Sequence, residues 1–238
     1  MCIPYFIVRM AREYANLFCF ILFFAIVQYS NSAQSVLRTK DLEEKRWRMV
    51  FLANSGNNQN VYDAWVKGTG TTSVKPATLQ RTHGPHYRDD TFLSAWTRTD
   101  IVSVKFAFYD QYRELAHVIF GGKGTDAINW FEPEQVLSSS YSDLTRHGTY
   151  NLFSIAGEGR WDVDRRFYIN RNYGGCDNDA GHFAVTDTNT KTGCAWDIHP
   201  VYPQFLYSKI NSVTVWDRRL FGRADFMAIF VETKRRRY

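Results

Sequence analysis

Short segments with alternating apolar and polar residues recur along the chain, and they favour a fold built mainly from strands. In the segment 102–108, Val and Phe occupy alternate positions while Ser103 and Lys105 fall between them, which is the pattern of a half-buried strand. The apolar segment 115–120 follows after a short polar gap, so the two segments predict a hairpin. Further strands are predicted at residues 47–52, 150–155, 166–169, 182–185, 213–216 and 226–231.

Aromatic residues make up 16% of the 238 residues, which favours an aromatic-rich core of strands over a Leu- and Ala-rich bundle of helices. We therefore expect a mainly β fold, either β-sandwich-like or a β-rich α+β arrangement, in a single compact domain over residues 47–231. Residues 34–46 are expected to be a polar lead-in and residues 232–238 a basic tail. The best helix candidate is 132–137, because Pro133 and the flanking acids suit a first helical turn, whereas 61–66 fits either a short helix or a strand.

The first 33 residues have the pattern of a secretory signal peptide. Arg9 and Arg12 precede an uncharged apolar run at 17–27, and small residues suited to cleavage follow at 30–33. A transmembrane helix needs about 20 apolar residues, so this run is too short to serve as an anchor. We expect residues 1–33 to be removed and the mature protein to be secreted, extracellular and without a transmembrane anchor.

Cleavage at this position leaves two cysteines, Cys176 and Cys194, because Cys2 and Cys19 are removed with the signal peptide. One disulfide bond is the natural expectation in the oxidising secretory route, and in the chain-entropy model it stabilises the fold by about 3 kcal/mol. Two free buried thiols are the alternative. A zinc site with His182 and His199 is less favoured, because no CxxC spacing supports it.

The net charge of +5 does not extend over the folded part of the chain. Without residues 1–33 the sequence has 27 basic and 23 acidic residues, and four of the basic ones are in the tail, which leaves the body at 23 against 23. The tail is either a weak handle for sulfated glycans, acidic matrix or a processing protease, or a solvated end. No nucleic-acid partner is expected, because the body lacks an excess of basic residues. The tail cluster consists of Lys234, Arg235, Arg236 and Arg237.

The segment 161–181 combines oxygen-bearing side chains, glycines and a cysteine, and it is the candidate ligand site. Calcium prefers six to eight oxygen ligands, which closely spaced carboxylates and amides next to a disulfide could supply. The sequence lacks an EF-hand loop, and such residues in a glycine-rich turn also serve as backbone hydrogen-bond acceptors. Calcium is the one cofactor that remains open. The candidate calcium or ligand-binding residues are Asp162, Asp164, Asp177, Asn178 and Asp179.

Three aromatic residues of the same region, Trp161, Tyr173 and Trp196, could stack on sugar rings while neighbouring polar groups bind hydroxyls. The alternative is that these side chains belong to the core of an aromatic-rich β domain. His83 and His86 are interpreted as residues of a surface loop, because Pro85 rules out a helical spacing for a metal site.

No catalytic residue is predicted. The sequence has no GxSxG, HExxH, phosphate-loop or dinucleotide motif, and the two remaining cysteines are expected to pair. We therefore expect a protein that is not an enzyme.

The chain resembles a domain of secreted, mostly uncharacterised proteins of marine invertebrates, some of them from extracellular or skeletal matrices. The segments that carry this resemblance are 61–65, 129–131, 137–140, 165–167, 173–176, 179–181 and 228–231. The chain is more distantly similar to fibrinogen-like lectins, in which acidic residues precede a cysteine and a Gly-aromatic segment. It departs from them in its longer cysteine spacing and in the missing N-terminal cysteine pair.

These observations give one leading functional hypothesis and one alternative. The leading hypothesis is a secreted extracellular matrix protein with a binding or structural role, for which a mineralised shell or skeletal matrix is one setting. The alternative is a calcium-dependent, lectin-like protein that binds carbohydrate. The expected partners are extracellular matrix or glycans.

Overall fold

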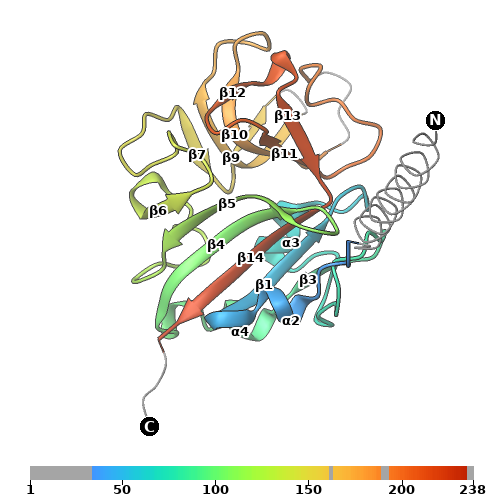
Figure 1. The fold of residues 1–238 in the computed structure, drawn as a ribbon, viewed down its shortest axis with the longest axis vertical. Helices are drawn as coiled ribbons and strands as arrows, with labels where there is room; N and C mark the ends of the chain where they lie inside the picture. Colours follow the sequence, from blue (N-terminus) through green and yellow to red (C-terminus); the bar gives the residue numbers. More distant parts are fainter. Residues whose placement is uncertain (1–33, 161–162, 189–192, 235–238) are drawn as a thin grey trace, which may run out of the picture. The chain divides into compact units, whose positions relative to one another are not determined.

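Strands dominate the part of the chain that the computed structural model describes, residues 34–160, 163–188 and 193–234 (Figure 1). The described residues from Val36 onward belong to one compact unit with two β-sheets, which confirms the predicted mainly β domain. The predicted signal peptide, residues 1–33, lies outside the described residues. No helix among the described residues is both long enough and apolar enough to cross a membrane.

The first sheet is antiparallel except for the pairing between its first two strands, which is parallel. The predicted hairpin is present, since Val104 pairs with Phe120 and Phe106 pairs with Val118. In spatial order the strands are β2 (Thr71–Thr72), β3 (His86–Arg88), β1 (Trp47–Asn54), β14 (Phe226–Thr233), β4 (Ile101–Tyr109), β5 (Glu114–Gly121) and β6 (Val136–Ser139).

The second sheet is antiparallel throughout and is formed by the second half of the chain. Its main path runs β13 (Phe221–Ala224), β11 (Gln204–Ser208), β10 (Ala180–Thr186), β9 (Val163–Asn172) and β7 (Leu152–Ser154). Two short strands extend it, β12 (Thr214–Val215) on β10 and β8 (Glu158–Arg160) on β9.

The helical segments are short and connect the strands. They are the α-helices α2 (Thr39–Leu42), α3 (Val61–Lys67) and α4 (Asp90–Ser94), and the 3₁₀ turns η1 (Glu44–Arg46), η2 (Trp96–Arg98), η3 (Pro133–Gln135) and η4 (Trp216–Arg218).

Phenylalanine side chains join the two sheets into one core. On β4, Phe106 stacks on Phe167 of β9 with ring centroids 5.7 Å apart. Phe106 and Phe108 also contact Phe183 of β10 edge-on, at 5.3 and 5.1 Å. Because side chains alternate along a strand, the intervening residues of the same strands form separate apolar clusters on the outer faces. The alternation recognised in the sequence therefore supplies the inner face of a β-sandwich.

A buried carboxylate connects the end of β10 to the start of α3. Asp187 is fully buried and accepts hydrogen bonds from the backbone N–H groups of Val61 (2.6 Å) and Tyr62 (2.8 Å). Burial raises the pKa of Asp187 to about 7, although these two donors act in the opposite direction. The segment 61–66, whose sequence fitted either a short helix or a strand, is a helix, and the Asp187 carboxylate lies at its N-terminus.

The predicted helix at 132–137 is wrong. Only the single 3₁₀ turn η3 forms, and the chain then continues as β6, in which Val136 pairs with Phe120. The acids and Pro133 do favour a helical first turn, but pairing of the following residues with β5 prevents its extension. The short strands β3, β8, β11 and β13 were not predicted, because their sequences are polar, glycine-containing or brief.

Candidate functional site

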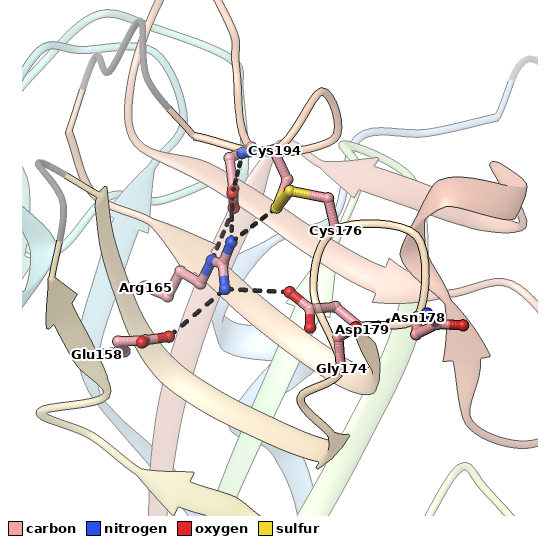
Figure 2. The surroundings of a disulfide bond; sticks show 8 residues. Glu158, Arg165, Gly174, Cys176, Asn178, Asp179 and Cys194 are labelled. Atoms are coloured by element: carbon pink, nitrogen blue, oxygen red, sulfur yellow. Dashed lines mark hydrogen bonds and ion pairs between the residues drawn. A yellow bond between two sulfur atoms is a disulfide. The ribbon is translucent and has the colours of Figure 1, made fainter.

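A disulfide bond and a buried ionic cluster lie together in the second sheet (Figure 2). Cys176 and Cys194 are bonded, with Cα atoms 5.3 Å apart, which confirms the predicted bridge. Cys176 is on the exposed turn between β9 and β10, whereas Cys194 is buried in the segment that follows β10. The bridge therefore fastens an exposed turn to a buried part of the protein.

Next to the bridge, one buried guanidinium group contacts three carboxylates. Arg165 of β9 binds Asp197 with two hydrogen bonds, Nε to Oδ1 at 3.1 Å and Nη2 to Oδ2 at 2.6 Å. Its Nη1 lies 3.3 Å from Oδ2 of Asp179 and 3.5 Å from Oε2 of Glu158. The Nη2 atom is also 3.3 Å from Sγ of Cys194. We call these four charged residues, Arg165, Glu158, Asp179 and Asp197, the Arg165 centre.

Aromatic rings enclose the Arg165 centre. The guanidinium carbon of Arg165 is 4.3 Å from the ring centroid of Trp196 and 5.9 Å from that of Tyr168. Trp196 in turn stacks on Trp216 at 5.5 Å. Cation–π contacts of this kind stabilise a guanidinium that has lost its water. The side chains of Arg165 and Asp197 are only 4% and 0% exposed, so the centre has little access to solvent.

The electrostatics of the centre follow from burial and pairing. Burial alone would lower the pKa of Arg165, but the hydrogen bonds and charge of Asp197 outweigh it and raise that pKa. Burial raises the pKa of Asp179 and of Asp197, although the charge of Arg165 acts in the opposite direction. The guanidinium is thus held as a permanent cation that neutralises buried carboxylates.

The predicted calcium ligands do not converge in the structure. Asp179 is buried against Arg165, Asp177 and Asn178 are exposed on the turn, and Asp164 pairs with Arg166 at 2.6 Å. Asp162 lies outside the described residues. Within the described ranges no group of three or more His, Cys, Asp or Glu side chains is arranged to hold a metal ion. The Asn178 amide instead donates to the carbonyl of Gly174 at 3.4 Å, the backbone role that such turns commonly have.

The three predicted stacking residues have different environments. Trp196 is 3% exposed and packs between Arg165 and Trp216, so burial gives it a packing role in place of the predicted contact with sugar. Tyr173 is 46% exposed, and its ring lies 5.8 Å from the guanidinium of Arg165. Trp161 lies outside the described residues. Tyr173 is therefore the one described member of the set that remains available to a ligand.

Tyr173 lines a surface pocket of about 370 Å³, which we call the Tyr173 pocket. Glu158, the most exposed carboxylate of the Arg165 centre, and Asn151 line the pocket beside the ring. Gly157 shapes the adjoining turn with a φ of +59°, and a Cβ there would overlap with the carbonyl oxygen of Arg165, so only glycine fits. The pocket combines one exposed ring with two hydrogen-bonding side chains, which is a suitable lining for a polyhydroxylated ligand. Its lining residues are Asn151, Leu152, Gly157, Glu158, Gly159 and Tyr173.

Two histidine–carboxylate pairs resemble parts of a catalytic triad but have the wrong geometry. His117 Nδ1 lies 2.6 Å from Glu114 and 3.2 Å from the hydroxyl of Ser140, so acid and hydroxyl share one ring nitrogen. A triad needs them on opposite nitrogens. His182 binds Asp143 through Nε2 at 2.9 Å, and its Nδ1 is buried with no partner among the described residues. Neither pair supplies an activated hydroxyl nucleophile.

The interpretation of His86 as a surface residue is wrong. His86 is fully buried on β3, where its Nδ1 accepts from the Asn54 N–H at 3.1 Å and its Nε2 faces the Gln59 carbonyl at 3.1 Å. Burial lowers the pKa of His86 to about 4, so it is a neutral structural side chain at physiological pH.

The basic tail is described only at its first member. Lys234 is exposed, and its backbone N–H donates to the carbonyl of Asp100 at 2.9 Å. Arg235, Arg236 and Arg237 lie outside the described residues.

The most important residues that the sequence did not reveal are Arg165 and Asp197. They are 32 positions apart, and their residue types are ordinary for a surface. The one available signal was the occurrence of Asp197 three residues after Cys194, in a segment that the disulfide was expected to fix in place.

Comparison with known proteins adds no family to these observations. No protein-family model, curated protein or solved structure matches this chain.

Proposed function

We propose that this protein is exported and acts as a binding component of an extracellular matrix, without catalysing a reaction. The observation that carries the proposal is the Cys176–Cys194 bridge, because disulfides persist in oxidising compartments and are rare in the cytosol. The apolar run at 17–27 supports the same route. The two histidine–carboxylate pairs, which lack triad geometry, favour binding over hydrolysis.

The bridge supports a role in binding through what it holds in place. It fastens the turn that begins at Tyr173 to the Arg165 centre, in which charge and aromatic packing fix the side chains. A rigid exposed ring loses little conformational entropy when a ligand stacks on it. A structural matrix protein that keeps its fold outside the cell needs this kind of covalent and ionic fixation.

Expression in secretory cells tests export. We expect the protein in the medium, with its N-terminus after residue 30 and with neither cysteine alkylated before reduction. Intact-mass measurement with and without reduction checks both points in one sample. Retention inside the cell with Met1 present and both thiols alkylated would refute the proposal.

A lectin-like activity is the second candidate, and the Tyr173 pocket favours it. Exposed rings stack on the apolar faces of sugars, while carboxylates and amides such as Glu158 and Asn151 bind hydroxyls. Because the described candidate calcium ligands are separated, we propose that this binding does not require calcium. The mineral or polysaccharide setting of the matrix is a further part of the proposal, supported by the resemblance to matrix proteins.

A glycan array tests the lectin-like activity. We expect Tyr173→Ala to weaken binding of a neutral glycan about 10-fold, equivalent to the loss of one aromatic contact. The matched control is Ile128→Ala, because Ile128 is also 46% exposed but does not line the pocket. Equal binding by wild type and Tyr173→Ala, or binding that disappears on calcium chelation, would contradict this assignment.

A further inference from the structure

A second pocket, of about 420 Å³, opens where the β4–β5 hairpin meets the ends of β6 and β11. Its lining is more basic than that of the Tyr173 pocket. Arg113, Glu114 and Leu115 line one side, Ser140 and Tyr141 follow β6, and residues 207–211 complete it. Pockets of this size commonly bind small molecules or single sugar units. We call it the Glu114 pocket.

Glu114, the one carboxylate that lines this pocket, is already neutralised by the protein. Its Oε2 accepts from Tyr109 Oη at 2.7 Å and from Lys105 Nζ at 2.5 Å, while its Oε1 lies 2.6 Å from His117 Nδ1. Burial would raise the pKa of Glu114, but the hydrogen bonds from His117, Lys105 and Tyr109 and the charge of Lys105 lower it to about 2. Glu114 therefore organises its neighbours and presents little negative charge to a ligand.

The cations that line the pocket remain available. The Lys209 side chain has no carboxylate or hydrogen-bond partner among the described residues. Arg113 is 71% exposed and has one weak partner, Asp110, at 3.5 Å. Lysine and arginine in such positions bind carboxylate or sulfate groups through charge-assisted hydrogen bonds.

Uncharged groups of the pocket suit the hydroxyls of a sugar. Tyr207 is half-buried, and its hydroxyl makes no hydrogen bond within the described ranges, although Arg113 lies close enough to influence its pKa. Gly222 on β13 leaves space for the Tyr207 ring, since a Cβ there would approach ring atoms to 2.5 Å. Ser140 and Asn211 add exposed polar side chains to the lining.

Positive charge continues beyond the pocket along a neighbouring segment. The backbone N–H of Lys209 donates to the carbonyl of Leu220 at 2.9 Å, so the end of η4 lies beside the pocket. Arg218 and Arg219 are exposed there, accompanied by one exposed carboxylate, Asp217. A row of cations next to a pocket favours a polymer with repeated anionic groups over a single small anion.

From this arrangement we propose that the Glu114 pocket binds one unit of an acidic polysaccharide. Arg113 and Lys209 contact its carboxylate or sulfate groups, Tyr207 and Asn211 bind its hydroxyls, and Arg218 and Arg219 attract the adjoining units. The inference rests on the proposed function only in that a matrix would supply the polymer. Binding by the purified protein succeeds or fails independently of where a cell places it.

Isothermal titration of the oxidised full-length protein carrying Tyr173→Ala tests this site, with fragments of sulfated dextran, polygalacturonate and neutral dextran of equal length. The substitution weakens binding of neutral glycans at the Tyr173 pocket, so the titration reports on the Glu114 pocket. We expect both acidic fragments to bind and neutral dextran not to bind. The stronger of the two identifies sulfate or carboxylate as the preferred group. Binding of neutral dextran with equal affinity would overturn the proposal.

Three variants locate the interaction. We expect Lys209→Gln and Arg113→Gln each to weaken binding about 5- to 10-fold, as the loss of one charge-assisted contact predicts. Tyr207→Phe, which removes only the hydroxyl, should weaken it about 3-fold. The matched control is Lys40→Gln, which makes the same change in net charge at an exposed position on α2. Equal weakening by Lys40→Gln and Lys209→Gln would show that only net charge matters and would refute the site.

Two competitors distinguish other ligands. Inorganic sulfate at constant ionic strength should not displace the polysaccharide, and displacement would mean that a single anion is the ligand. The second competitor is duplex DNA. If DNA binds more tightly than the acidic polysaccharides and Lys209→Gln weakens that binding, the ligand of the pocket is a nucleic acid and the proposal is overturned.

Discussion

The Arg165 centre and the Glu114 pocket contain similar residue types in opposite arrangements. In the Arg165 centre one guanidinium contacts three carboxylates, and side-chain exposure is 4% for Arg165 and at most 17% for its partners. At the Glu114 pocket one carboxylate is paired with Lys105 and also contacts Tyr109 and His117, and the lining cations, Arg113 and Lys209, are exposed.

The difference separates charges that stabilise the fold from charges that can bind. The buried contacts of Arg165 with Asp197 and Asp179 leave these groups little capacity for a ligand, because exposing them again would lose the pairing. An exposed cation beside a neutralised carboxylate keeps that capacity. The stability of this domain should therefore depend on the Arg165 centre, and recognition of anions on the Glu114 pocket.

Removal of the central guanidinium should have the largest effect on stability. Arg165→Met leaves Asp197 and Asp179 buried without a counter-charge, so we expect a loss of about 3–5 kcal/mol in the free energy of unfolding. Arg48→Met is the matched control, since Arg48 is 55% exposed in its pair with Asp89 and should cost no more than about 1 kcal/mol. Urea unfolding measures both, and equal losses would contradict the comparison.

Loss of the disulfide should follow in size. Replacement of Cys176 and Cys194 by serine should lower the free energy of unfolding by about 3 kcal/mol, because the reduced chain gains entropy when unfolded. Thermal unfolding of the variant and of the reduced wild type should agree. We expect the Glu114 pocket to keep its affinity for anions, since the disulfide bond lies next to the Arg165 centre and does not line that pocket. Equal loss of anion binding would show that the two regions are coupled.

The pH dependence of stability should have opposite signs in the two regions. The pKa of Glu114 is lowered from 4.5 to about 2, so its contribution is present above pH 4.5 and is lost as pH falls toward 2, by about 1–3 kcal/mol. The pKa of Asp179 is raised above 3.8 by burial, so its contribution is present below pH 3.8 and is lost as pH rises through its folded-state value.

Denaturation of two variants across the pH range separates these effects. Relative to wild type, Glu114→Gln should lack the loss of stability between pH 4.5 and 2. Asp179→Asn should lack the loss above pH 3.8. If the free energy of unfolding changes with pH in the same way for wild type and both variants, neither the pKa of Glu114 nor that of Asp179 is shifted by folding.

Changes to the exposed cations should have the smallest effect on stability. Lys209→Gln should change the free energy of unfolding by less than about 0.5 kcal/mol, because the side chain has no partner among the described residues. Differential scanning calorimetry of this variant gives the check. A loss above about 1 kcal/mol would mean that Lys209 has a structural role and is not free for a ligand.

Local sequence patterns predicted much of the inner sandwich. Side chains alternate between the two faces of a strand, so the alternating apolar residues of β4 predicted that strand from local sequence. The short polar gap before the next apolar segment then predicted the hairpin of β4 and β5. The disulfide was predictable because only two cysteines remain after residue 33. Strand β13 was missed because its pairing with β11, and not its local composition, stabilises it. Strand β8 pairs with the adjacent strand β9, but its three residues, Glu158–Arg160, have no apolar pattern that predicts a strand.

Long-range contacts explain why the candidate site was only partly predicted. Asp179 was identified as an oxygen donor, yet its partner Arg165 lies 14 positions earlier and Asp197 lies 18 positions later on another segment. Trp196 and Tyr173 have similar sequence surroundings but very different exposure, because only Trp196 has both Arg165 and Trp216 to pack against.

Hydrogen–deuterium exchange of the oxidised protein, with and without a saturating sulfated dextran fragment, tests the division between the two regions. We predict slower exchange in residues 113–117 and 207–211 when the fragment is bound, and unchanged exchange in residues 173–179. Protection of 173–179, or of neither region, would contradict the assignment of anion binding to the Glu114 pocket and of structural support to the Arg165 centre.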